Sequence, residues 1–189
     1  KSIVTSEDQG KGIEKEKTFL ISHLGNILVN VKVQICISEE KHSWDNCCLL
    51  LVTATDMAVL CGNNGEVCWT KYGAYPHRAK YCHEQAVRIL LGAIDAAAGR
   101  YKRHIVPVLS VSVDFYIRCF VRVYTSAAEA KLAPTKVSYV YQCVGCDTFE
   151  SQPVGKAVRK GNSTKFQAGS GPAVPESCPN CGWHYNMGG

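Results

Sequence analysis

Two pairs of cysteines in the last third of the chain have the residue type and the spacing of a metal site. Two residues separate Cys143 from Cys146, and two separate Cys178 from Cys181. A C-x-x-C turn aims two thiolates at one point, so two such turns complete a tetrahedral site of four sulfurs. Gly145, inside the first turn, lets backbone N–H groups approach the sulfurs. The sequence therefore predicts one structural Zn²⁺ ion, and the alternatives are four unrelated thiols or a redox pair.

The chain has eleven cysteines, and the other seven show no metal-site spacing. The odd number and the irregular intervals do not resemble a small disulfide scaffold, which favours a reducing compartment. In such a compartment most unpaired cysteines are small buried hydrophobes. We expect this for Cys36, Cys47, Cys48, Cys61, Cys68, Cys82 and Cys119.

One carboxylate follows the most apolar segment of the chain. Residues 47–53 (CCLLLVT) suit a strand buried on both faces of a parallel sheet, and Asp56 comes shortly after them. Open α/β sheets place their ligands at the carboxyl ends of strands. Asp56 is therefore either a functional-site residue or a helix N-cap or turn residue.

Basic and aromatic side chains mix in residues 61–104, where seven Lys plus Arg face three acidic residues, a local net charge of +4. Lys71, Tyr72, Arg78 and Lys80 combine the chemistry of phosphate contact with that of base stacking. They predict contact with RNA, and the alternative is a solvated loop.

A second basic group lies between the two cysteine pairs, in a stretch rich in Gly and Ser. It comprises Lys156, Arg159, Lys160 and Lys165. These residues either contact an RNA backbone or belong to a soluble linker. The formal net charge of the whole chain is +5, which permits a nucleic-acid partner without demanding one.

Hydrophobic periodicity predicts the elements that position these residues. Residues 81–101 have apolar side chains at i, i+3, i+4 and i+7, which predicts a well-buried helix. Alternation predicts a strand over 27–37 and two strands within 105–125, broken near Asp114. Phe115, beside that break, either packs in the core or holds an extruded base.

The organisation along the chain is uneven. Residues 1–48 are not assigned to a domain. The sequence of residues 61–76 predicts a long loop with a short helix. The Ala-rich stretch 126–134, which ends in a proline, marks a gradual domain boundary. It separates a domain over residues 49–125 from one over residues 126–189. No apolar run approaches the roughly 20 residues of a membrane-spanning helix, and no secretory signal is evident, so we expect no membrane partner.

Six motifs together resemble the eukaryotic tRNA (guanine-N2) methyltransferases that dimethylate guanine at tRNA position 26. The resemblance covers residues 49–189, roughly three quarters of the chain. The motifs are LLVTATDMAVLCG (50–62), KYGAYPHR (71–78), CHEQAVRILLGAI (82–94), PVLSVSVDFYIRCFVRVYT (107–125), YQCVGCDTFESQPVGK (141–156) and CPNCGWHYNMGG (178–189).

The resemblance implies an α/β fold in two parts. Residues 49–125 correspond to the C-terminal half of a Rossmann-like methyltransferase domain that uses S-adenosylmethionine, and residues 126–189 to a small zinc-binding domain. The resemblance also implies tRNA as the partner and a location in the nucleus, the mitochondrion or both. In such an enzyme Asp56 would lie near the methyl acceptor, as a candidate catalytic residue.

The chain also departs from the family pattern. It lacks the glycine-rich loop after the first strand, the acidic residue for the ribose and the Asp-Pro-Phe-Gly-like motif. Residues 1–48 do not match what should precede the fifth strand of the sheet. We therefore expect a fragment of a tRNA guanine dimethyltransferase that does not catalyse alone. The alternative is a non-catalytic, zinc-stabilised tRNA-binding module.

Overall fold

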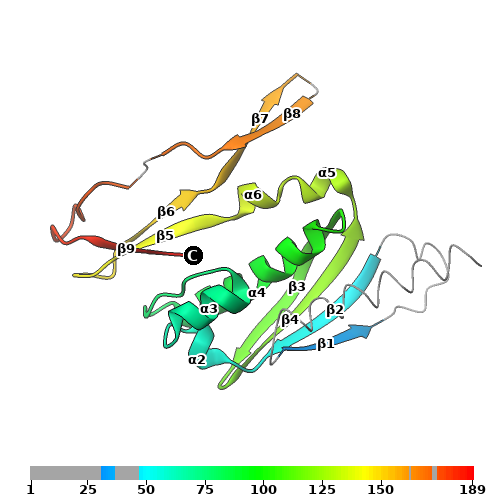
Figure 1. Ribbon diagram of the computed structural model, residues 1–189, viewed down its shortest axis with the longest axis horizontal. Coiled ribbons are helices and arrows are strands. Elements are labelled where there is room, and N and C mark those ends of the chain that lie inside the picture. The colour runs from blue at the N-terminus through cyan, green and yellow to red at the C-terminus, as the bar shows by residue number, and fades with distance from the viewer. Residues whose placement is uncertain (1–30, 37–46, 162, 172–173) are drawn as a thin grey trace, which may run out of the picture.

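The computed structural model describes residues 31–36, 47–161, 163–171 and 174–189. Within these ranges the chain forms a four-stranded sheet covered by helices, followed by a smaller group of strands (Figure 1). The strand predicted over 27–37 is found as β1 (Val31–Cys36), and the rest of that prediction lies outside the described residues. Most of the unassigned segment 1–48 also lies outside them.

The larger sheet has the strand order β1-β2-β4-β3. Its other strands are β2 (Cys47–Ala54), β3 (Arg103–Val113) and β4 (Tyr116–Thr125). All neighbouring pairs are antiparallel, so the prediction that β2 belongs to a parallel sheet is wrong for its described neighbours. The reason is the placement of β4, which returns from β3 through a tight turn and lies between β3 and β2.

Strand β2 is also not buried equally on its two faces. Leu50, Val52 and Ala54 are fully buried, whereas Leu49 and Leu51 are half-buried. This alternation is typical of an antiparallel sheet with one face against a helical layer. The prediction that β2 is buried on both faces is therefore wrong for the face with Leu49 and Leu51. The apolar run could not show that the helices cover only the other face.

The helices α2 (Met57–Leu60), α3 (Gly65–Tyr72) and α4 (Cys82–Gly99) lie on the well-buried face of the sheet (Figure 1). The predicted helix over 81–101 and the short helix within 61–76 are thus confirmed. Leu90 and Ile94 of α4 pack with Ile117 and Val121 of β4 in the main core. None of the helices among the described residues is long and apolar enough to cross a membrane.

The break predicted near Asp114 is also confirmed, since β3 ends at Val113 and β4 begins at Tyr116. Asp114 adopts a left-handed backbone with φ of 42°, a conformation that Asp tolerates better than most residues. Phe115 follows it at the tip of the hairpin and is 82% exposed. Core packing of Phe115 is therefore excluded, because the turn holds it away from the helical layer.

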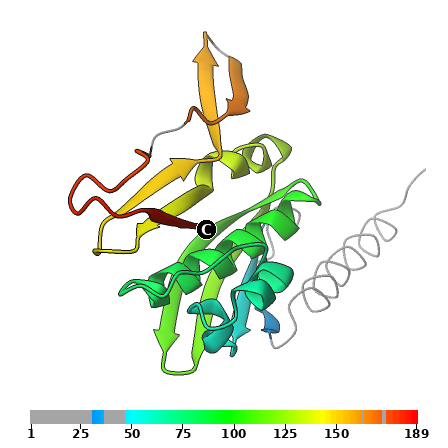
Figure 2. The same ribbon diagram turned by 60° about the vertical axis from the view of Figure 1, so that its left-hand side comes forward.

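Short helices α5 (Ala127–Ala130) and α6 (Ala133–Lys136) lead from β4 to the smaller strands. Strand β5 (Ser138–Cys143) lies between β6 (Phe149–Pro153) and β9 (Tyr185–Gly188) in an antiparallel sheet. The antiparallel hairpin of β7 (Gly155–Lys160) and β8 (Ser163–Ala168) projects away from the rest of the chain (Figure 2).

Candidate metal centre and its docked arm

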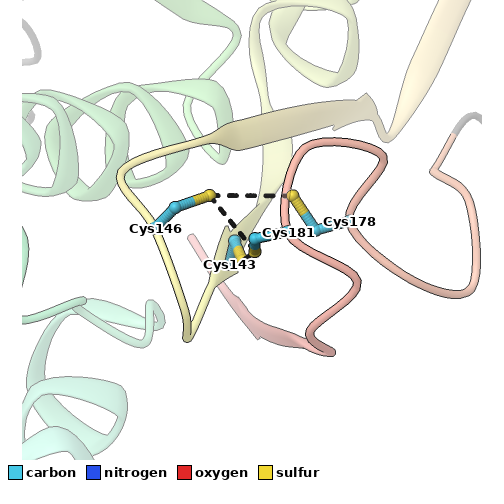
Figure 3. A group of neighbouring side chains, drawn as sticks. All are labelled: Cys143, Cys146, Cys178 and Cys181. Atoms are coloured by element: carbon cyan, nitrogen blue, oxygen red, sulfur yellow. Dashed lines mark hydrogen bonds between the residues drawn. The ribbon is translucent and has the colours of Figure 1, made fainter.

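The smaller sheet brings the two cysteine pairs together. Cys143 ends β5 and Cys146 lies in the turn after it, while Cys178 and Cys181 lie in the segment that leads into β9 (Figure 3). The Sγ–Sγ distances are 3.3 Å from Cys143 to Cys181, 3.7 Å from Cys146 to Cys178 and 3.5 Å from Cys181 to Cys146. A tetrahedron with Zn–S bonds of ~2.3 Å has edges of ~3.8 Å, so these sulfurs fit a tetrahedral metal ion closely.

Backbone donors around the sulfurs favour thiolate at two of the four positions. The pKa of Cys178 falls to about 6: burial opposes ionisation, but hydrogen bonds from the backbone N–H groups of Asn180 and Cys181 and from two neighbouring thiols together outweigh it. The hydroxyl and backbone of Thr148 likewise lower the pKa of Cys146. The N–H of Gly145 lies 3.3 Å from the Cys143 sulfur, as expected for a glycine in a cysteine turn.

The pKa of the Cys181 thiol is raised instead of lowered. The N–H of Trp183 favours its thiolate, but burial and the three neighbouring thiols outweigh that bond and raise the pKa of Cys181 to about 12. Four thiols this close cannot all ionise unless a cation balances their charge. A divalent ion supplies that balance, so the cluster can hold a metal ion as a set of four thiolates.

Residues 73–81, here called the arm, connect α3 to α4 and dock on the cysteine-bearing sheet. Tyr75 and Gly189 exchange backbone hydrogen bonds of 3.4 Å and 2.9 Å. The ring of His77 contacts the carbonyl of Val140 at 3.1 Å. These bonds join the arm to β5 and to the end of the chain.

Two side chains at the end of the arm continue the contact. The Tyr81 hydroxyl donates to the Gln142 side chain at 2.7 Å. Lys80 pairs with Asp147, which lies in the first cysteine turn next to Cys146. The arm is thus held at the cysteine cluster by side chains as well as by backbone.

Asp56 lies at the start of α2, directly after β2, but its side chain makes no capping bond. Its carboxylate instead accepts hydrogen bonds from the Tyr72 hydroxyl at 2.6 Å and from Lys71 Nζ at 3.2 Å. The Asp56 side chain is only 7% exposed. Burial raises the pKa of Tyr72, and the hydrogen bond to Asp56 raises it further, so the hydroxyl stays a donor.

The structure separates the basic residues of the first group. Tyr72 is 6% exposed and offers no free face to a base. Lys71 is engaged with Asp56, whereas Arg78 and Lys80 lie on the arm. Arg78 donates to the carbonyl of Gly62 at 3.2 Å and to the side chain of Asn63 at 2.9 Å, both in the loop before α3.

The second basic group lies on the β7–β8 hairpin. Lys165 faces Val158 across the two strands, so it shares one face with Lys156 and Lys160. Arg159 points to the opposite face, which it shares with Phe166. The hairpin therefore gathers three lysines on one exposed surface, here called the lysine face.

Sequence reasoning missed one cluster. The ligand atoms of Cys61, Cys82 and His83 lie within 4.8 Å of one another. No spacing signals this cluster, because Cys61 and Cys82 are far apart in the chain. Among the other thiols, Cys68 and Cys119 are buried as expected, whereas Cys48, Cys61 and Cys82 are half-buried.

Comparison with known proteins gives a consistent result. The family model for N2,N2-dimethylguanosine tRNA methyltransferase matches residues 37–189. The chain is 64% identical over 141 residues to tRNA (guanine(26)-N(2))-dimethyltransferase 2 of Arabidopsis thaliana, covering 75% of this chain and 24% of that protein. It is 50% identical over 143 residues to the human tRNA (guanine(26)-N(2))-dimethyltransferase, covering 75% and 22%.

A solved structure shares the fold. Trm1 from Pyrococcus horikoshii, in complex with S-adenosyl-L-methionine, aligns with a TM-score of 0.54 at 34% identity, over 68% of this chain and 34% of that one. The chain thus spans about a quarter of the length of its curated relatives. On the match over residues 37–189, the chain belongs to the N2,N2-dimethylguanosine tRNA methyltransferase family.

Proposed function

We propose that this chain is the tRNA-binding, zinc-stabilised part of an enzyme that dimethylates the exocyclic amine of guanine 26 in tRNA. The observation that carries the proposal is the family match over residues 37–189. The lysine face and the docked arm support the tRNA contact. In the complete enzyme S-adenosylmethionine supplies the methyl group.

The described residues do not fit a cofactor site at the end of β2. The acidic side chain there, Asp56, is buried and already accepts hydrogen bonds from Tyr72 and Lys71. It presents no free carboxylate to a ribose or to an attacking amine. We therefore assign Asp56 a structural role at the strand end and route no catalytic step through it.

We further propose Zn²⁺ as the ion at Cys143, Cys146, Cys178 and Cys181. Four thiolates in a tetrahedral set are the usual ligands of structural zinc. The surrounding sheet has few buried side chains, and Cys143 and Cys178 are the buried hydrophobic residues of this part. A segment with so little core depends on the ion for its folding free energy. On this proposal residues 126–189 fold as a zinc-dependent unit.

We propose that tRNA contacts two surfaces. One is the arm, with Arg78 and Lys80. The other is the hairpin, with Lys156, Lys160 and Lys165 on one face and Arg159 on the other. The side chains of Lys156, Arg159, Lys160 and Lys165 are exposed, as phosphate contacts require. Because the arm docks on the cysteine sheet, loss of zinc would also displace Arg78 and Lys80.

The test incubates the zinc-loaded chain with labelled S-adenosylmethionine and unmodified tRNA. Salt-sensitive tRNA binding without methyl transfer is the expected result, since the described residues hold no cofactor site at the strand end. Methyl transfer to guanine would contradict the claim that catalysis lies outside this chain. Absence of tRNA binding would contradict the proposed contact surface.

A zinc control separates the two parts of the proposal. Cys146→Ser removes one of the four ligands, and Cys48→Ser removes a half-buried thiol of β2 outside the cluster. We expect loss of the ion at this cluster and of tRNA binding in the first variant and neither loss in the second. Full zinc content in Cys146→Ser would refute the proposed ligand set.

A further inference from the structure

A second group of metal-ligating side chains lies where the end of α2 meets the start of α4, outside the four-cysteine cluster. Cys61 follows α2 as its C-terminal cap, and Cys82 is the first residue of α4. His83 comes next in the same helix. Their two Sγ atoms and one ring nitrogen all lie within 4.8 Å of one another, although they come from two separate elements.

These three groups have the chemistry of a soft divalent cation site. Two thiolates and one imidazole are ligands that Zn²⁺ and Co²⁺ prefer. In a tetrahedral zinc site the ligand atoms are separated by ~3.5–3.8 Å, so each pair has to close by at most ~1.3 Å. Side-chain rotation about Cα–Cβ bonds supplies a shift of that size.

Exposure favours entry of an ion and leaves one coordination position open. Cys61 and Cys82 are half-buried and His83 is exposed. Ser112 Oγ lies 3.4 Å from His83 Nδ1, a weak contact that leaves the ring free to rotate. Three protein ligands with solvent in the fourth position are typical of exchangeable zinc rather than of closed structural sites.

We propose that Cys61, Cys82 and His83 form a second, solvent-accessible site for a thiophilic divalent cation such as Zn²⁺. Ion binding would join the end of α2 to the start of α4. It would also fix the loop after Cys61, in which Gly62 and Asn63 hold Arg78. The site thus controls how rigidly Arg78 of the arm is held. The inference does not depend on the proposed tRNA contact.

The first experiment counts metal in the full chain. Chain purified under reducing conditions is equilibrated with Zn²⁺, separated from free ion and analysed by elemental mass spectrometry. We expect about two zinc ions per chain in the wild type and about one in Cys82→Ser. Serine suits the first turn of a helix, so Cys82→Ser should fold. Cys48→Ser, a half-buried cysteine elsewhere, should keep both ions.

A second measurement uses Co²⁺ as the probe and His83→Gln as the variant. His83 is exposed, so this change should leave the fold intact. We expect the second equivalent of Co²⁺ to add tetrahedral absorption bands in the wild type and not in His83→Gln. A Cys146→Ser chain should lose the other ion and keep this one, which separates failure here from failure at the four-cysteine cluster.

Two results would overturn the proposal. One is a zinc content of about one per chain in the wild type that Cys82→Ser leaves unchanged. The other is a Cys61–Cys82 disulfide in chain purified under reducing conditions, detected by mass spectrometry of the unreduced peptides, because oxidised sulfurs do not bind the ion as thiolates.

Discussion

The hydroxyl of Tyr72, at the end of α3, donates a 2.6 Å hydrogen bond to the carboxylate of Asp56, at the start of α2. Both side chains are almost fully buried. The bond therefore joins the end of α3 to the start of α2, just after the end of β2.

Removal of this hydroxyl should destabilise the chain. Tyr72→Phe leaves a buried carboxylate with only Lys71 as its described side-chain partner, and a hydrogen bond to a charged group contributes about 1.5–3 kcal/mol. We expect the free energy of unfolding in urea to fall by that amount. Tyr75→Phe, at a residue that is 46% exposed, is the control and should change little. Equal stability of the two variants would show that the Asp56 bond does not contribute.

The docking of the arm should depend on Gly188. A Cβ at this position would lie 2.5 Å from the Tyr75 carbonyl oxygen and 2.5 Å from the His77 ring. The backbone oxygen cannot move without breaking the pairing of Tyr75 with Gly189. Gly188→Ala should therefore lower the free energy of unfolding by about 1–3 kcal/mol.

Gly92 provides the matched control for Gly188. It lies in the middle of α4, and a Cβ there would meet nothing within 4 Å. Gly92→Ala should stabilise the chain by about 1 kcal/mol, because Ala has the better helix propensity. If both substitutions proved neutral in thermal and urea unfolding, the close approach of the arm to β9 would be refuted.

Zinc retention should depend on pH through the cysteine cluster. The pKa of Cys178 is lowered from 9.0 to about 6, so its ionisation stabilises the folded state. That contribution is full above pH 9.0, declines as the pH falls, and is lost below about pH 6. Protons then compete directly with the metal, so bound zinc should be released on acidification, at a pH below the metal-free pKa of Cys178 because the ion stabilises the thiolate.

A zinc-sensitive dye measures this release at constant ionic strength. Far-ultraviolet circular dichroism on the same samples should show loss of strand signal with the zinc and retention of the α4 signal. Zinc retention that did not change on acidification from about pH 8 to about pH 3 would contradict the involvement of Cys178 as a thiolate ligand.

The lysine face should account for part of the salt dependence of tRNA binding. Replacement of Lys156, Lys160 and Lys165 by Gln should weaken binding and reduce the slope of log K against log[salt] by about 2–3, roughly one for each phosphate that a lysine no longer neutralises. Arg88→Gln and Lys131→Gln, exposed residues outside the hairpin, serve as charge controls. A slope unchanged in the triple variant would exclude the hairpin from the tRNA contact.

The local sequence determined much of the fold. The 3.6-residue period over 81–101 predicted α4, and the alternation within 105–125 predicted two strands broken near Asp114. Both patterns extend over neighbouring residues, so they predict a helix or a strand without knowledge of its tertiary contacts. The six motifs also identified the family, which the match over residues 37–189 shows.

The tertiary structure decided which residues meet. The antiparallel neighbours of β2 follow from the insertion of β4 between β2 and β3. The half-burial of Leu51 follows from the helices covering the other face of the sheet, and no local period encodes either arrangement. The bond between Asp56 and Tyr72 likewise depends on the packing of α3 against α2. So does the meeting of Cys61 with Cys82, because contacts between distant segments are set by the burial of the whole core. Sequence spacing signals ligands that lie within one turn, as in each C-x-x-C pair, and gives no such signal for Cys61 with Cys82.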